Sequence, residues 1–319
     1  MSIAYARYNL ENGYIHNWIV AGPQAIPIGD PEGFAGEDGR LQIARRYYTK
    51  DAGVNDTPAE LGRFTLDDGT ELVWRYDRCR EDHFVDLTAF YHSCHYLRAW
   101  AYTRVASPVA QEVTLVLTTN GPADVWLNGR HLHRQEHLSS QMPRSVPFQA
   151  AFHEGHNEIL VRFEEVAEHE CPYVMALQVV GLSGKPDETG VFLPTQINAV
   201  ARREVLEKVF YAAYLDQDVY VYDDNITLYW PEDMAISSII MARFQSPDGR
   251  IYGESERVAK AGQQAIISIP YMVREGRYEA RLMPPRLEYY EKGMRITRRI
   301  GLWTVKNRYS QQPYGTYTE

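Results

Sequence analysis

The chain has 319 residues and a formal net charge of -9, and 45% of its residues are hydrophobic. That length suits two domains, and the hydrophobic share excludes wholesale disorder. The acidic balance argues against a protein that follows the phosphates of a nucleic acid, so we expect no nucleic-acid partner.

The N-terminus and the cysteines bear on location. Residues 1–18 lack the basic region and the continuous apolar run of a signal peptide, and no stretch approaches ~18 uninterrupted apolar residues. Cys79, Cys94 and Cys171 are odd in number and form no CxxC pair, which predicts reduced thiols. We therefore expect a cytoplasmic protein with no membrane partner.

The first hundred residues contain strand signals separated by breakers. Glycine and proline crowd residues 1–40 around one apolar run, 18–21, which predicts a short strand followed by a long surface loop. A second strand is predicted at 72–76, after the turn at 67–69. Residues 96–105 alternate. One face carries Leu97, Ala99, Ala101 and Thr103, and the other carries Tyr96, Arg98, Trp100, Tyr102 and Arg104.

The middle of the chain has the rhythm of a β-sandwich. Residues 113–119 are a β-branched run, and we predict a hairpin through Asn120-Gly121-Pro122 to 123–127. Asn128-Gly129 is the preferred dipeptide of a type I′ turn. Further strands are expected at 146–152, 158–163 and 173–180. Short strands with glycine-rich turns favour a sandwich or jelly roll over residues 1–197.

The pattern changes near residue 198. Apolar residues at helical spacing predict a linker helix over 198–213. Strand signals then resume, with a Pro-Asp-Gly turn at 246–250, and predict an immunoglobulin-like sandwich over 214–308. Trp230 and Trp303 are assigned to its core. Residues 309–319 are polar and breaker-rich, like a tail or a truncated linker, so a C-terminal domain is expected beyond this chain.

Three segments carry a resemblance to a known family: residues 17–23 (Asn-Trp-Ile-Val-Ala-Gly-Pro), 124–129 (Asp-Val-Trp-Leu-Asn-Gly) and 155–161 (Gly-His-Asn-Glu-Ile-Leu-Val). In this order they resemble the galactose-binding-like jelly-roll domains at the front of multidomain glycoside hydrolases. The resemblance covers about residues 14–182. It implies a sugar-binding or structural accessory domain, with any catalytic domain outside this chain.

Candidate catalytic and metal-binding residues lack the patterns that such sites need. No Gly-x-Ser-x-Gly elbow, phosphate loop or dinucleotide-binding fingerprint is present. His131 and His133 have the spacing of two ligands, but a solvent-facing strand explains them as well. Asp223-Asp224-Asn225 could contact a structural Ca²⁺, yet no Asp-x-Asp-x-Asp-Gly loop supports it. We predict no metal, no cofactor and no catalytic residue.

The best binding candidate is a strand end that combines aromatic rings with arginines. Sugars stack their C–H faces on rings, and their hydroxyls accept hydrogen bonds from arginine. The predicted ligand-binding residues are Trp74, Arg75, Tyr76, Arg78, Tyr91 and His92. The alternative is that Trp74 and Tyr76 pack inside the protein. Trp126 faces away from Val125 and Leu127 and is predicted to pack on its sheet.

These observations predict an all-β protein, a galactose-binding-like jelly-roll sandwich joined by a short helix to an immunoglobulin-like sandwich. The predicted function is a non-catalytic carbohydrate-binding or accessory region of a carbohydrate-active protein. The alternative is a structural or protein-interaction module that binds no sugar. A stand-alone glycoside hydrolase is a further, weaker alternative, because no pair of carboxylates is placed on rigid elements by the sequence.

Overall fold

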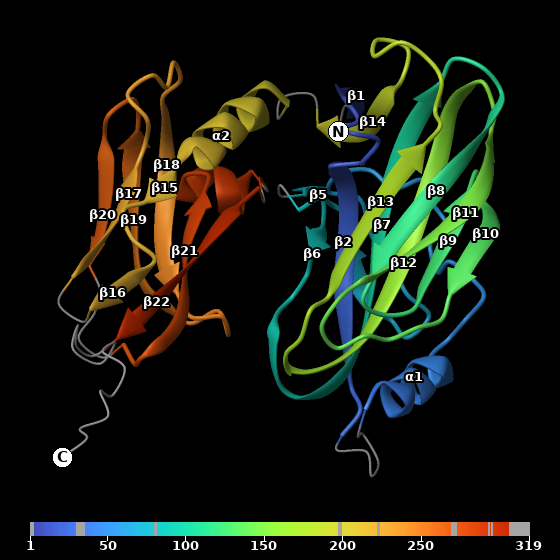
Figure 1. The fold of residues 1–319 in the computed structure, drawn as a ribbon, viewed down its shortest axis with the longest axis horizontal. Coiled ribbons are helices and arrows are strands. Elements are labelled where there is room, and N and C mark those ends of the chain that lie inside the picture. Colours follow the sequence, from blue (N-terminus) through green and yellow to red (C-terminus); the bar gives the residue numbers. More distant parts are fainter. Residues whose placement is uncertain are drawn as a thin grey trace, which may run out of the picture. The chain divides into compact units, whose positions relative to one another are not determined.

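The computed structural model describes residues 3–29, 36–79, 82–196, 200–221, 224–268, 273–292, 294 and 296–305. The predicted tail, 309–319, and Asp223 lie outside these residues. The chain divides into two compact units, Met1–Ile197 and Asn198–Glu319. Both are built mainly of strands (Figure 1), so the all-β class is confirmed. Within the described residues, no helix has the length and apolar character needed to cross a membrane.

The larger sheet of the first unit runs in the order β1-β14-β7-β12-β9-β10. In addition, β2 pairs with β7, and β5 pairs with β2. Its strands are β1 (Ile3–Tyr8), β2 (Asn17–Pro27), β5 (Arg75–Arg78), β7 (Phe90–Ser107), β9 (Ala123–Leu127), β10 (Arg130–Gln135), β12 (Gly155–Glu170) and β14 (Gly190–Gln196). β7 is buried on both faces, as Ala99 and Trp100 illustrate. The predicted alternation over 96–105 therefore describes a strand that is covered on both sides.

The smaller sheet has the order β11-β8-β13-β6. Its strands are β6 (Val85–Asp86), β8 (Gln111–Thr119), β11 (Arg144–Phe152) and β13 (Val174–Val180). Val113, Leu115 and Leu117 of β8 are buried, whereas the residues between them are partly exposed. This sheet thus has one apolar face, as expected for one layer of a sandwich.

The predicted hairpin of 113–119 with 123–127 is wrong. β8 belongs to the smaller sheet and β9 to the larger one, so 120–122 crosses between the layers. Gly121 allows this crossing, because a Cβ there would lie 2.0 Å from the carbonyl oxygen of Glu164. The Asn128-Gly129 hairpin is confirmed: both residues have positive φ, 50° and 77°, as a type I′ turn requires.

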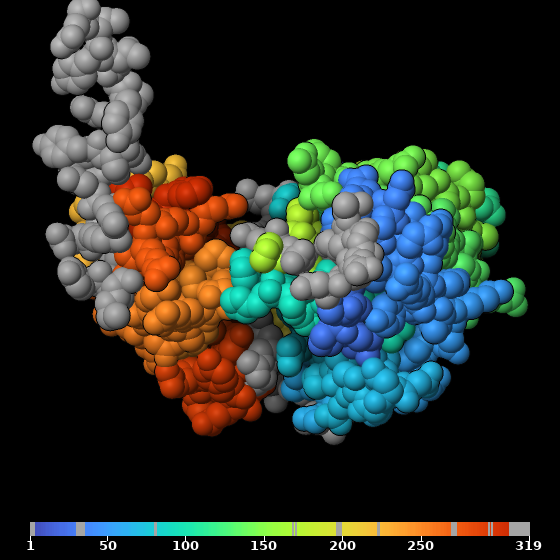
Figure 2. Space-filling view, turned by 90° about the horizontal axis from the view of Figure 1, so that it is seen from below, coloured from blue at the N-terminus to red at the C-terminus, as the bar shows by residue number. Residues whose placement is uncertain are grey.

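A helix and a loop cover the second face of the larger sheet. Helix α1 (Glu37–Arg46) contacts β12, and its Ile43 and Ala44 join a buried cluster with Tyr96 and Val166. A short hairpin, β3 (Arg63–Thr65) with β4 (Glu71–Val73), follows. In the space-filling view these segments, in the lighter blues, lie on the outside of the first unit (Figure 2). Helix α1 was not predicted, because the glycines of 29–39 indicate a loop.

The described residues of the second unit form two sheets and one α-helix. One sheet has the order β15-β17-β20 and the other β16-β22-β21-β18-β19. The elements are α2 (Val200–Ala212), β15 (Tyr214–Leu215), β16 (Val219–Val221), β17 (Asn225–Tyr229), β18 (Ser238–Gln245), β19 (Ile251–Ala259), β20 (Gln264–Ser268), β21 (Gly276–Met283), the π-helical turn η1 (Leu287–Glu291) and β22 (Arg298–Val305). Strands therefore form most of this unit too.

Helix α2 packs within the second unit. Its Leu206, Val209 and Phe210 are buried, and the indole nitrogen of Trp230 donates a hydrogen bond to the Val209 carbonyl at 2.9 Å. The assignment of Trp303 to the core is wrong, because this side chain is 50% exposed. On β22 the alternating positions Leu302 and Thr304 turn inward instead.

The Trp230 bond gives a first testable prediction. Trp230→Phe should lower the stability of the second unit by about 1–3 kcal/mol, because it leaves the buried Val209 carbonyl without its donor and removes ring volume. The urea dependence of methionine oxidation measures it, since a buried thioether is protected from peroxide until its unit unfolds. Met241 reports the second unit and Met175 the first. An equal loss at both methionines would contradict the prediction.

Candidate functional site

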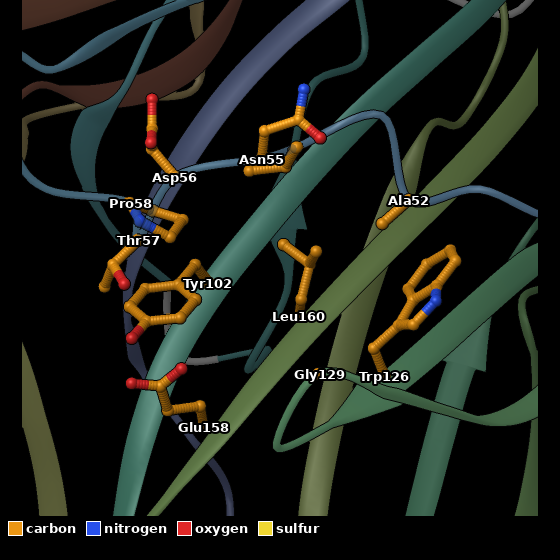
Figure 3. Close-up of a pocket in the computed structure, with 11 residues that line it drawn as sticks. Ala52, Asn55, Asp56, Thr57, Pro58, Tyr102, Trp126, Gly129, Glu158 and Leu160 are labelled. Atoms are coloured by element: carbon orange, nitrogen blue, oxygen red, sulfur yellow. The ribbon is translucent and has the colours of Figure 1, made fainter.

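A pocket lies on the face of the larger sheet that α1 and the following loop cover (Figure 3). Its floor is a row of side chains from three neighbouring strands. Leu160 of β12 is the register partner of Tyr102 on β7 and of Trp126 on β9. Two aromatic rings therefore flank one aliphatic side chain on a rigid sheet. Tyr102 and Trp126 are buried, at 2% and 6% exposed, and Leu160 is partly exposed.

The roof of the pocket comes from a distant part of the sequence. Six residues between α1 and β3 line the cavity: Ala52, Val54, Asn55, Asp56, Thr57 and Pro58. The cavity volume is about 210 Å³. Drug-sized ligands occupy pockets of roughly 300–1,000 Å³, so this volume suits a smaller ligand with a single ring.

Buried side chains of the sheet hold the start of this roof. Arg162, in the row next to the floor, is 1% exposed and donates to the carbonyl oxygens of Thr49 and Asp51. The indole nitrogen of Trp100, the register partner of Arg162, donates to the Ala52 carbonyl at 2.7 Å. Because each anchor is itself packed in the sheet, the roof is fixed before a ligand arrives.

The rim of the pocket is the row on the other side of the floor. Arg104 and Glu158 are register partners, and their side chains form an ion pair. The Arg104 Nε also donates to the Tyr102 hydroxyl at 3.0 Å. Figure 3 shows the Glu158 carboxylate directed toward that hydroxyl. Burial raises the pKa of Tyr102, so the phenol stays protonated and can donate to a ligand or to Glu158.

A buried ionic cluster lies beneath the roof. Asp124, fully buried, accepts from Arg162 Nη2 at 2.8 Å, Arg134 Nη1 at 2.6 Å and His131 Nε2 at 2.8 Å. Glu164 lies 3.5 Å from Arg162 Nε, but neither of its oxygens has a hydrogen-bond partner among the described residues. Burial raises the pKa of Glu164 to about 7, against the opposing effect of the arginines.

The two rings predicted to bind ligand lie in the interior of the first unit. Trp74 is 2% exposed and stacks on Phe64, with ring centroids 5.1 Å apart. Tyr76 is buried, and its hydroxyl accepts a hydrogen bond from Asn17 at 2.8 Å. Both rings pack against protein side chains, and neither lines the pocket.

The other four predicted residues are spread over β5 and β7. Arg75 is exposed, and Arg78 lies 4.0 Å from the Glu11 carboxylate. Tyr91 packs beside His95, and the exposed His92 packs beside Phe90. None of the six predicted residues lines the pocket. The pocket is instead lined by Tyr102, Trp126 and Glu158, among other residues.

The histidine pair at 131 and 133 forms no metal site. A register shift separates the two residues on β10. His131 bonds to Asp124, whereas His133 stacks on Phe148 with ring centroids 4.1 Å apart. Across the described ranges, no group of three or more His, Cys, Asp or Glu side chains could hold a metal ion.

The comparisons with known proteins find likeness only among solved structures. No protein-family model matches the chain, and no curated protein matches it in sequence. A family 35 carbohydrate-binding module from Clostridium thermocellum is 16% identical, over 30% of this chain and 87% of that one, with a TM-score of 0.22. A Faecalibacterium prausnitzii β-glucuronidase is 11% identical, over 94% of this chain and 46% of that one, with a TM-score of 0.25.

A Kluyveromyces marxianus β-glucosidase in complex with glucose is 9% identical, over 90% of this chain and 51% of that one, with a TM-score of 0.28. The chain spans about half the length of these two glycosidases. At such TM-scores the likeness carries no argument about activity. The fold and the pocket themselves define an all-β protein of two units, one of which carries a small aromatic pocket on a sheet face.

Proposed function

We propose that the first unit is a non-catalytic module that binds a single sugar ring in the pocket over Tyr102, Leu160 and Trp126. The carrying observation is the floor, a flat apolar row bounded by hydrogen-bonding side chains. A sugar has the complementary surface, with C–H faces that pack on rings and hydroxyls around its edge. Glu158, Asn55 and Thr57 supply acceptors and donors at the pocket wall.

The motifs at 124–129 and 155–161 support this proposal from a second direction. They resemble galactose-binding-like accessory domains, and they supply Trp126, Gly129 and Glu158 to the pocket. We propose that the first unit is such a jelly roll, that the second is an immunoglobulin-like sandwich, and that both belong to a larger carbohydrate-active protein. The module is non-catalytic in this proposal because Arg104 already occupies the Glu158 carboxylate.

Titration of the full chain with methyl glycosides of common hexoses and pentoses, followed by calorimetry and ligand-observed NMR, tests the proposal. We expect saturable binding of at least one glycoside. Trp126→Leu, which keeps apolar volume but removes the ring, should weaken it by roughly tenfold, equivalent to about 1.4 kcal/mol.

Arg75→Ala is the matched control, because Arg75 is an exposed residue of the same sheet that does not line the pocket. It should leave the affinity unchanged. If no glycoside binds, the first unit is a structural or interaction module. If Arg75→Ala abolishes binding and Trp126→Leu does not, the site lies on β5 and the pocket assignment is wrong. Turnover of a chromogenic glycoside would contradict the non-catalytic role.

A further inference from the structure

The charged side chains that line the pocket are both acidic, although one of them, Glu158, is paired with Arg104. Among the lining residues, all of which the structure describes, the ionisable acids are Asp56 and Glu158, and none is Lys, Arg or His. The polar neutral groups are the Asn55 amide, the Thr57 hydroxyl and the Tyr102 hydroxyl. A ligand in this cavity therefore meets aromatic rings and the Glu158 carboxylate, which is already paired with Arg104, while the exposed Asp56 carboxylate is directed away from the floor (Figure 3).

The nearest arginines are already engaged by the protein. Arg104 is paired with Glu158, donates to Tyr102 and lies over the ring of Tyr5, with its guanidinium carbon 4.9 Å from the centroid. Arg162 lies one row deeper, donates to the roof and pairs with the buried Asp124. Neither guanidinium can turn to an anionic ligand without breaking bonds that hold the sheet or the roof.

A cation would meet the opposite situation. Aromatic ring faces attract an ammonium group, and so do carboxylates within a few ångströms. The guanidinium carbon of Arg162 already lies 5.1 Å from the centroid of the Trp126 ring, which shows that this ring accepts a cation. An anion would lose hydration on entry and would gain no charged partner in return. The lining thus distinguishes ligands by charge as well as by shape.

We propose that the pocket selects sugars by charge, accepting amino sugars with a protonated amine in preference to neutral sugars and rejecting sugars that carry a carboxylate. This selectivity rests on the proposed function, since it concerns the same pocket. The predicted ligands are therefore neutral sugars and amino sugars.

Calorimetric titration of the full chain at pH 6 and low salt, with four monosaccharides of one stereochemistry, tests the selectivity. The ligands are glucose, glucosamine, N-acetylglucosamine and glucuronic acid, the third being the neutral match for the second. We expect glucosamine to bind about two- to fivefold more tightly than either neutral sugar, the effect of one partly exposed ion pair. Glucuronic acid should bind more weakly than glucose, and the differences should shrink at higher salt.

Two variants locate the effect. Asp56→Asn should lower the preference for glucosamine, because it removes the lining carboxylate that Arg104 does not pair with. Glu158→Gln leaves Arg104 without its carboxylate and should turn the preference toward glucuronic acid. Glu112→Gln removes an exposed carboxylate from β8, in the other sheet, and should change no ratio.

The outcomes separate the two claims. If the neutral sugars bind but glucosamine binds no more tightly, or glucuronic acid binds best, the charge selectivity is overturned while sugar binding stands. If none of the four sugars and none of the methyl glycosides binds, both claims are overturned.

Discussion

Replacing Arg162 with leucine should lower the free energy of unfolding of the first unit by about 3–5 kcal/mol. Arg162 is the anchor between β12 and the roof, so the variant leaves two loop carbonyls without donors and removes one cation from the buried Asp124. A buried charge that loses its partner costs more than the ion pair itself contributes. The loss should appear in the urea midpoint of oxidation at Met175 but not at Met241.

The same variant should loosen the roof before the sheet unfolds. Hydrogen exchange should rise first in residues 49–58, and the affinity for any ligand of the pocket should fall with it. Arg104→Leu is the matched control, because it removes an arginine from the same face whose side chain is 20% exposed. Its stability loss should be at most about 1 kcal/mol.

Equal losses of unfolding free energy for Arg162→Leu and Arg104→Leu would contradict this prediction. They would show that the buried ionic cluster stabilises the first unit no more than the partly exposed Arg104 ion pair does. Should the leucine variant fail to accumulate, Arg162→Lys provides the measurement. Lysine keeps the charge opposite Asp124 but lacks the fork that reaches Thr49 and Asp51 together. It should therefore retain more stability than the leucine variant and still loosen the roof.

The strands of this protein can be predicted from the sequence because local residue patterns determine where they form. The alternation over 96–105 assigns the two faces of β7 correctly, and Asn128-Gly129 predicts a hairpin whose positive φ angles the structure contains. Local residue patterns do not determine which strands pair. Residues 120–122 look like a hairpin turn, yet they cross between sheets, because the partner of β8 is chosen by the packing of distant β11 and β13.

The pocket could not be predicted from the sequence, because it too depends on which distant strands pair. Its floor is a row of residues from three strands, and a row exists only once the register is fixed. Alternation was enough to predict that the ring of Trp126 faces away from Val125 and Leu127. It did not show what covers that face of the sheet. The cover, residues 52–58, has no periodicity. Trp74 and Tyr76 were predicted to bind ligand because composition does not reveal which rings of a short segment are buried, and both are buried.

The stability of the first unit should fall as the pH rises from 5 to 8, by about 3 kcal/mol from Glu164 alone. Burial raises the pKa of Glu164 from its usual 4.5 to about 7. Between these values the folded state holds a proton that the unfolded chain has released. The contribution is therefore complete below pH 4.5 and is lost as the pH passes the folded value. The urea midpoint at Met175, measured across this range, reports it.

The variant Glu164→Gln isolates the contribution of this carboxyl group to the pH dependence of stability. Glutamine has nearly the same shape and no charge, so the variant should match the natural protein near pH 5 and exceed it at pH 8. Glu112→Gln, on the exposed side of β8, should keep the original pH dependence. Glu165 adds to the slope in the same direction, since burial raises its pKa to about 8 although Arg40 lies 2.7 Å away and opposes the rise. A pH dependence that survives Glu164→Gln unchanged would mean that Glu164 is ionised in the folded protein at neutral pH. In that case the attraction between the arginines around Asp124 and the ionised Glu164 carboxylate outweighs the cost of desolvating that carboxylate.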